Sequence, residues 1–200
     1  MTWKIVGSLM AGVLLGRLLN VENGEVLGLV GDFALAALLF AVGFSLGADA
    51  DLGRKIKGLP KIYLAVPFLV AAGSLIGAVA LGLLGGVVPG EAALVGAGFG
   101  WYSLSAVLIA QGYDLTLGTL ALLTNVFREF LAILLIPAVA RRLGKAAAVA
   151  PGGATAMDVT LPIIAAHTDS QTAILAFYSG TVLSALVPVV IPFILQLLQS

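Results

Sequence analysis

The chain has 200 residues, of which 60% are hydrophobic and 10% are charged, and its ten Lys and Arg residues balance its ten Asp and Glu residues. So few polar residues cannot cover a water-soluble domain of this length, so the composition predicts a membrane protein. The net charge of zero argues against a nucleic-acid partner. The lack of cysteine in the sequence excludes disulfides, thiolate metal sites and cysteine nucleophiles.

A helix that spans a bilayer needs roughly 20 apolar residues, and seven stretches are candidates. In chain order they are residues 5–19, 26–48, 62–88, 92–112, 115–140, 152–167 and 172–198. The connections are short and rich in Gly, Pro and charge, so residues 1–200 are expected to form a single transmembrane transporter domain. The first stretch lacks a small-x-small cleavage site and is expected to be a retained helix. We predict an all-α polytopic membrane protein with about six to seven hydrophobic segments and an inverted-repeat core.

Two loops, residues 54–61 and 141–145, carry seven of the ten Lys and Arg residues. The positive-inside bias predicts that both loops and the N-terminus are cytoplasmic, with the acidic turn at Glu22 and Glu25 outside. Three full crossings between the two basic loops would instead place them on opposite sides. Segment 92–112 is therefore expected either to re-enter on one side or to cross as a discontinuous helix with one loop against the bias.

The stretch GAGFGWYSLS, residues 96–105, predicts a helix break at Gly98 and Gly100. In hydrocarbon, freed backbone groups are tolerated where they are buried in protein or line a cavity, so a break is a place to look for a ligand. The candidate lining residues that follow are Trp101, Tyr102, Ser103 and Ser105. The two hydroxyl groups either bind a polar ligand or satisfy the freed backbone, and the aromatic rings either line the site or anchor at the interface.

Segment 115–140 carries polar residues near its middle: Asn125, Arg128 and Glu129. A charge at mid-bilayer costs about 3 kcal/mol on insertion scales, so such residues usually face a cavity or a partner. Asn125 and Glu129 share one helix face because they are four residues apart. For Arg128 the structural alternative is a pair with a carboxylate that pins two helices together.

A second break is predicted in PGGATAMDVTLP, residues 151–162. Gly152 and Gly153 permit an unwound stretch before a short helix expected to carry Thr155 and Asp158, with N–H groups that suit an anion. Asp158 either caps a neighbouring helix or joins Glu129 as a second buried carboxylate. Two such carboxylates could load and release protons.

The sequence offers no support for an enzyme or a cofactor. His167 is the single histidine, which excludes a histidine metal pair. We therefore predict neither a metal site nor catalytic residues.

Residues 98–105, Arg128-Glu129, Ile136-Pro137 and residues 152–162 together resemble the LysO-type lysine exporter family. The resemblance also covers residues 43–46 and the basic loop after them. It implies export of L-lysine, and of lysine analogues, across the cell membrane, with an intramembrane acidic pair at Glu129 and Asp158. Longer members have an additional N-terminal block of membrane helices, so a homodimer or a small separately encoded membrane subunit is expected.

The chemistry of these residues and the family resemblance together suggest a hypothetical mechanism. Glu129 and Asp158 suit the two ammonium groups of lysine, and the N–H groups near Gly100 and Gly153, or Arg128, suit its carboxylate. Protons or another coupling ion that compete for the carboxylates would make the protein an antiporter. The alternatives are a cation or small-solute channel, and a membrane subunit that needs a partner for activity.

Overall fold

The structure is a computed structural model that describes Leu15, Phe44 and residues 57–199. The chain forms two compact units, residues 1–52 and residues 53–200. The predicted segments 5–19 and 26–48 therefore lie outside the described residues, except for Leu15 and Phe44, which are both helical. That the whole chain is one domain stays a prediction.

Three long helices frame the second unit: α5 (Val66–Leu84), α8 (Leu115–Arg142) and α10 (Ser170–Gln199). Within the described residues, these are the helices long and apolar enough to cross a membrane. A short helix, α4 (Lys61–Leu64), precedes α5. Every regular element in the described part of the chain is helical, which confirms the predicted all-α membrane class.

Between α5 and α8 lies an interrupted hairpin, here called the first hairpin. It consists of α6 (Pro89–Gly96) and α7 (Tyr102–Gly112), separated by a break at residues 97–101. Its two ends meet, because the Tyr113 hydroxyl donates to Glu91 Oε1 at 3.0 Å. The same end of the hairpin contacts the end of α10, where Gln199 Nε2 donates to the carbonyl of Gly112 at 2.8 Å.

A second hairpin lies between α8 and α10. It contains two 3₁₀ turns, η1 (Ala146–Val149) and η2 (Gly153–Met157), followed by α9 (Leu161–His167). Lys145 Nζ and Asp169 Oδ2, which flank it in the sequence, form an ion pair at 2.9 Å. The second hairpin therefore also begins and ends at one end of the unit.

The expected short helix carrying both Thr155 and Asp158 is wrong in detail. The turn η2 ends at Met157, and Asp158 has φ −136° and ψ −89°, outside the helical region. The reason is local: the N–H and the hydroxyl of Thr160 both donate to the carbonyl of Thr155, at 2.9 and 3.0 Å. These bonds close the turn before α9 begins.

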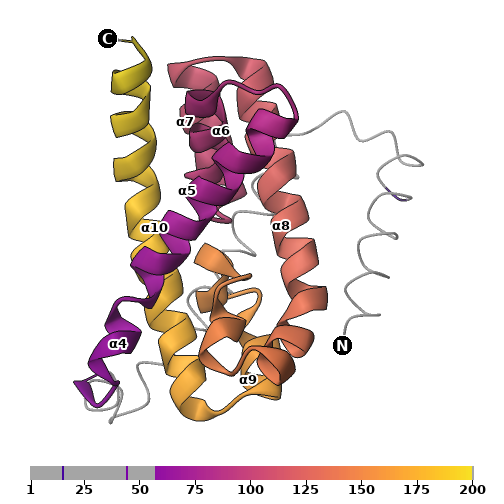
Figure 1. Ribbon diagram of the computed structural model, residues 1–200, viewed down its shortest axis with the longest axis vertical. Coiled ribbons are helices and arrows are strands. Elements are labelled where there is room, and N and C mark those ends of the chain that lie inside the picture. Colours follow the sequence, from indigo (N-terminus) through magenta and orange to yellow (C-terminus); the bar gives the residue numbers. More distant parts are fainter. Residues whose placement is uncertain (1–14, 16–43, 45–56, 200) are drawn as a thin grey trace. The chain divides into compact units, whose positions relative to one another are not determined.

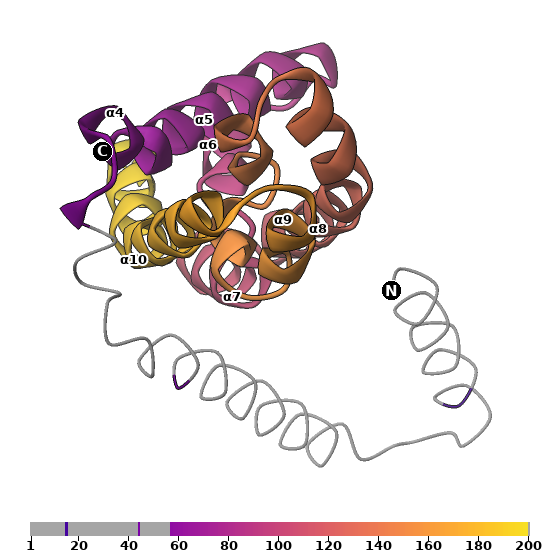
Figure 2. The ribbon, with the colours of Figure 1, turned by 90° about the horizontal axis from the view of Figure 1, so that it is seen from below.

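The two hairpins approach the middle from opposite ends of the unit. Figure 1 shows α6 and α7 towards the end that carries the C-terminus, and α9 towards the end that carries α4. Seen from the α4 end, α5 lies across from α7, with α8 and α10 to either side (Figure 2). Gly180 of α10 allows close packing on η2, because a Cβ there would lie 2.5 Å from the nitrogen of Met157.

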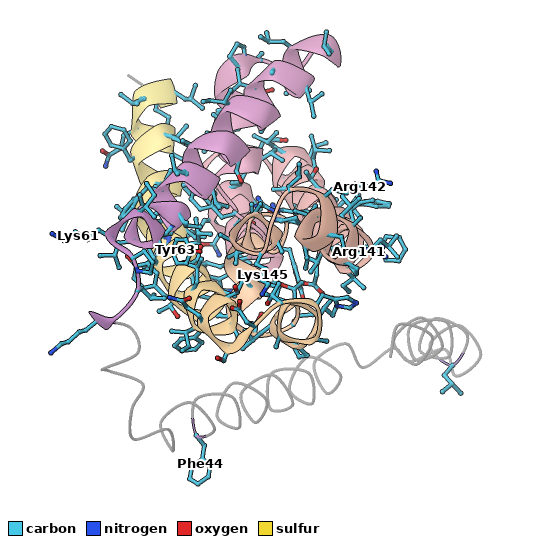
Figure 3. The ribbon with its side chains drawn as sticks, turned by 60° about the horizontal axis from the view of Figure 1, so that its bottom comes forward. Phe44, Lys61, Tyr63, Arg141, Arg142 and Lys145 are labelled. Carbon is cyan, nitrogen blue, oxygen red and sulfur yellow. The ribbon has the colours of Figure 1, made fainter. Side chains whose placement is uncertain are left out.

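Charge is divided between the two ends of this unit. The end brought forward in Figure 3 carries Lys61, Arg141, Arg142 and Lys145. The two arginines lie in the last turn of α8. Among the described residues, the other end carries Glu91 and Asp114 and no cation. The described parts of both basic loops thus lie at one end, as the re-entrant alternative requires. Which side of a membrane that end faces stays a prediction.

Candidate functional site

The two predicted breaks meet at the centre of the unit. The carbonyl of Phe99, in the first break, accepts a hydrogen bond of 2.8 Å from the N–H of Ala154 in the second. Phe99 is fully buried and has φ +48°, a conformation that non-glycine residues seldom adopt and that marks local strain. Gly100 and Gly153, with φ +105° and +60°, flank this contact, and Gly153 leaves no room for a side chain because a Cβ there would clash with the carbonyl of Phe99. The tips of the two hairpins are therefore hydrogen-bonded to each other.

Asn125 of α8 holds the first break. Its Oδ1 accepts from the N–H of Gly100 at 2.8 Å, while Nδ2 donates to the carbonyls of Val95 at 3.3 Å and Ala121 at 2.9 Å. Only 2% of Asn125 is exposed. The bonds to Gly100 and Val95 go to backbone groups of the first hairpin, so there the amide replaces hydrogen bonds that a continuous helix would have made.

Arg128, one turn further along α8, holds the second break in the same way. Its Nε donates to the carbonyl of Pro151 and its Nη2 to that of Ala150, both at 3.2 Å. Its Nη1 donates to Ser74 Oγ of α5 at 2.8 Å. The structural alternative foreseen for Arg128, a pair with a carboxylate, is wrong for the described residues, because these acceptors are carbonyl and hydroxyl oxygens.

Two carboxylates and a phenol converge beside the crossing. Asp158 acts electrostatically on Glu129, and both act on the hydroxyl of Tyr102, the first residue of α7. Glu129 Oε2 is buried without a hydrogen-bond partner, and the Asp158 carboxylate accepts from backbone N–H groups next to it, including that of Val159, which lies 2.5 Å from Oδ1. Neither carboxylate pairs with a cation in the described part of the chain. The site can therefore accept positive charge.

Comparison with known protein families identifies the family of this chain over nearly its whole length. Residues 6–195 match the model of the family described as Lysine exporter LysO. The chain belongs to the LysO family. No solved structure matches it.

Two relatives bear on the length of this family member. It is 33% identical to the Lysine exporter LysO of Escherichia coli strain K12 over 162 residues, which cover 81% of the chain and 54% of that relative. It is 29% identical to a Haemophilus influenzae protein named "Putative lysine exporter" over 194 residues, which cover 95% of the chain and 96% of that relative. The chain thus spans about half the length of the first relative and nearly all of the second.

The other predicted site residues of this LysO-family chain are divided between backbone support and exposure. Ser105 is fully buried and donates to the carbonyl of Tyr102 at 3.3 Å. Thr155 donates to the carbonyl of Gly152 at 2.9 Å. Ser103 is exposed and Trp101 is 37% exposed. Ser105 therefore bonds to the backbone within the first turn of α7, and Thr155 bonds to the backbone of the second break.

Two of the backbone N–H groups near the breaks are engaged by the protein itself. The N–H of Ala154 is bonded to Phe99, and the N–H of Gly100 to Asn125, while an anion site at Gly152 and Gly153 stays a prediction. The dipole of the short turn η2, with five residues, is correspondingly small.

Sequence reasoning missed Ser74 and Phe99. Ser74 is the one hydroxyl residue within α5, and that isolation was the available signal. Phe99 gave no signal, because its role rests on a backbone carbonyl and a strained φ that another apolar residue could also supply.

Proposed function

We propose that this protein exports L-lysine, and related cationic amino acids, through the site formed by Glu129, Asp158 and Tyr102. The observation that carries the proposal is the convergence of two carboxylates with no cationic partner at the crossing of two helix breaks. Secondary transporters commonly bind substrate between broken helices in the middle of the membrane. The names of the relatives in Escherichia coli and Haemophilus influenzae supply lysine as the substrate class.

The carboxylates are the binding groups for the ammonium groups of lysine. A carboxylate oxygen buried without a partner, as Glu129 Oε2 is, is costly in hydrocarbon, and a bound cation removes that cost. A proton on the same oxygen removes it as well, so protons and lysine compete for Glu129 and Asp158. This competition supports proton-coupled antiport as the mechanism.

The carboxylate of lysine is best matched by the start of α7. Arg128 and the N–H groups of Gly100 and Ala154 are engaged by the protein itself. The N–H groups of residues 102–104 have no acceptor among the described residues, and Tyr102 carries the phenol that lies near both carboxylates. A helix N-terminus favours an anion because its dipole and free N–H groups point at it. Lysine therefore spans from α7 to the carboxylates.

Reconstitution of the purified chain in vesicles tests the proposal. Labelled lysine uptake should saturate, increase with an imposed pH gradient and exceed uptake of cadaverine, which lacks the carboxylate. Glu129→Gln and Asp158→Asn should each reduce the transport efficiency at least about 30-fold, because removing one partner of a buried charge pair costs roughly 2 kcal/mol or more. Glu91→Gln, the same chemical change at the acidic end, should transport normally.

Full lysine transport by both carboxylate variants would overturn the proposal. Uptake that does not saturate and ignores the pH gradient would indicate a channel instead. The association with a second copy or with a small separate membrane subunit stays a prediction, and cross-linking in the native membrane checks it.

A further inference from the structure

Arg128 connects three elements through one side chain. It belongs to α8, its Nη1 reaches Ser74 of α5, and its Nε and Nη2 reach the carbonyls of Pro151 and Ala150 in the second hairpin. A planar guanidinium presents donors in several fixed directions, whereas an ammonium group is a point charge on a flexible stem. The geometry of these three contacts therefore depends on arginine itself.

The carbonyls that Arg128 binds come immediately before the hairpin tip. Gly153 packs against the guanidinium so closely that a Cβ would lie 2.8 Å from Nη2 and 3.0 Å from Cζ. The next residue, Ala154, is bonded to Phe99 of the first hairpin. Both residues belong to the five-residue turn η2, and Asp158 comes directly after it. The position of Asp158 is thus fixed by a short rigid turn that starts where Arg128 holds the backbone.

An open groove lies on one side of this contact. The groove, of about 550 Å³, runs between α5 and η1, and Arg128 and Ser74 form part of its wall. The rest of the wall is apolar and mostly small, including Gly73, Gly77 and Ala147. Because no described side chain fills this groove, the hydrogen bonds of Arg128 supply a constraint on the hairpin that packing on this side does not.

We propose that Arg128 is a positioning residue that ties the second hairpin to α5 and thereby sets the place of Asp158, and that it does not bind the substrate. The proposal rests on the proposed function of the site, because it assigns Asp158 a role in binding. The two proposals can be distinguished by comparing the transport of lysine with that of cadaverine. A residue that bound the lysine carboxylate would matter for lysine and not for cadaverine, whereas a residue that positions Asp158 matters for both.

The test compares lysine and cadaverine transport by the reconstituted chain and its Arg128→Lys variant. Lysine at this position keeps the charge but cannot make the three contacts at once. We expect transport of both substrates to fall in parallel, by up to about 100-fold, as for other displacements of an active group by roughly 1 Å. Ser74→Ala, which removes only the α5 contact, should lower both to a smaller extent. A loss confined to lysine would overturn the proposal.

A second readout follows the hairpin directly, because the chain has no native cysteine. Val159→Cys, next to Asp158, should change its rate of maleimide labelling several-fold when Arg128→Lys is added. Val107→Cys in α7, a hairpin held by Asn125, is the matched control and should not change. An unchanged rate at Val159→Cys in a folded Arg128→Lys protein would also overturn the proposal. If the unmodified chain transports neither substrate, the proposed function fails, while the labelling result still decides the positioning role.

Discussion

At the scale of single residues, two side chains of α8 make the broken helices possible. A buried N–H or carbonyl without a partner costs about 1–3 kcal/mol even in water-soluble proteins. Asn125 bonds to Val95 before the first break and to Gly100 within it, and Arg128 satisfies two carbonyls at the second break. Each break is thus paired with one polar residue on the same neighbouring helix.

Replacing Asn125 by alanine should destabilise the protein strongly. The change leaves the N–H of Gly100 without its acceptor and removes one of the two donors to the carbonyl of Val95, so we expect a loss of roughly 2 kcal/mol. Thermal unfolding in detergent, followed by tryptophan fluorescence, measures the effect. Thr124→Ala is the control on the same helix, because Thr124 is exposed and should stay within about 0.5 kcal/mol of wild type. Equal midpoints for the two variants would show that Asn125 is not a structural support.

The sequence identified which polar residues gather at the site but not what each one contacts. Spacing placed Asn125 and Glu129 on one face of a helix, yet the structure gives them different surroundings. Asn125 is enclosed by backbone groups, and Glu129 has a buried oxygen with no partner. The difference depends on where the breaks of other segments cross α8. These tertiary contacts cannot be predicted from the spacing of residues along a single helix.

At the scale of elements, the start of α10 shows how a helix end outside the membrane is fixed. Asp169 Oδ1 accepts from the N–H and the hydroxyl of Thr172, both at 2.8 Å, and Oδ2 pairs with Lys145. The backbone N–H of Thr172 contributes most, followed by Lys145, in lowering the pKa of Asp169 to about 2. The ion pair is exposed, and such pairs contribute about 0–1 kcal/mol, so the cap is the larger effect.

Substitutions at Asp169 should separate the cap from the ion pair. Asp169→Asn retains a capping oxygen but loses the contribution of the ionised carboxylate, so at neutral pH its stability should lie between wild type and Asp169→Ala, which should lose about 1 kcal/mol or more. The depressed pKa stabilises the folded state above pH 3.8, and this contribution is lost as the pH falls towards about 2. Unfolding midpoints measured across that range should converge for wild type and Asp169→Asn. A wild-type advantage that persists below pH 2 would contradict this assignment.

The long helices could be predicted from the sequence, and the second hairpin could not. Segments 115–140 and 172–198 agree closely with α8 and α10, because an uninterrupted apolar run of that length has few other structures. The chain at residues 146–157 forms two 3₁₀ turns although it is rich in alanine, a strong helix former. Contacts from Arg128, Phe99 and Thr160 outweigh the local propensity there.

At the scale of the whole second unit, two hairpins of opposite direction explain the distribution of charge. The first opens towards Glu91 and Asp114, and the second towards Arg142 and Lys145. The chain from α5 to α10 therefore crosses the unit three times, through α5, α8 and α10, although it contains five segments. This count brings the described residues of both basic loops to one end, in agreement with the positive-inside bias.

Single-cysteine labelling in intact cells tests this topology. If residues 89–112 form a re-entrant hairpin, Gly85→Cys and Leu115→Cys lie on the same side of the membrane, and a membrane-impermeant maleimide should modify both. Gly58→Cys and Leu143→Cys should react only after permeabilisation, because the positive-inside bias places the basic end in the cytoplasm. All four positions are exposed, and none contributes a side chain to the candidate site.

The comparison of Gly85→Cys with Leu115→Cys decides between the two sequence-based alternatives. A discontinuous crossing would place these positions on opposite sides, so modification of only one of them in intact cells would rule out the re-entrant hairpin. Modification of the Gly58 and Leu143 variants alone would keep the hairpin and invert the orientation. The orientation matters for the proposed function, because it would determine from which end lysine reaches the proposed site at Glu129 and Asp158. An exporter needs access from the cytoplasmic end, so the labelled face also fixes which hairpin, first or second, lies on the loading side.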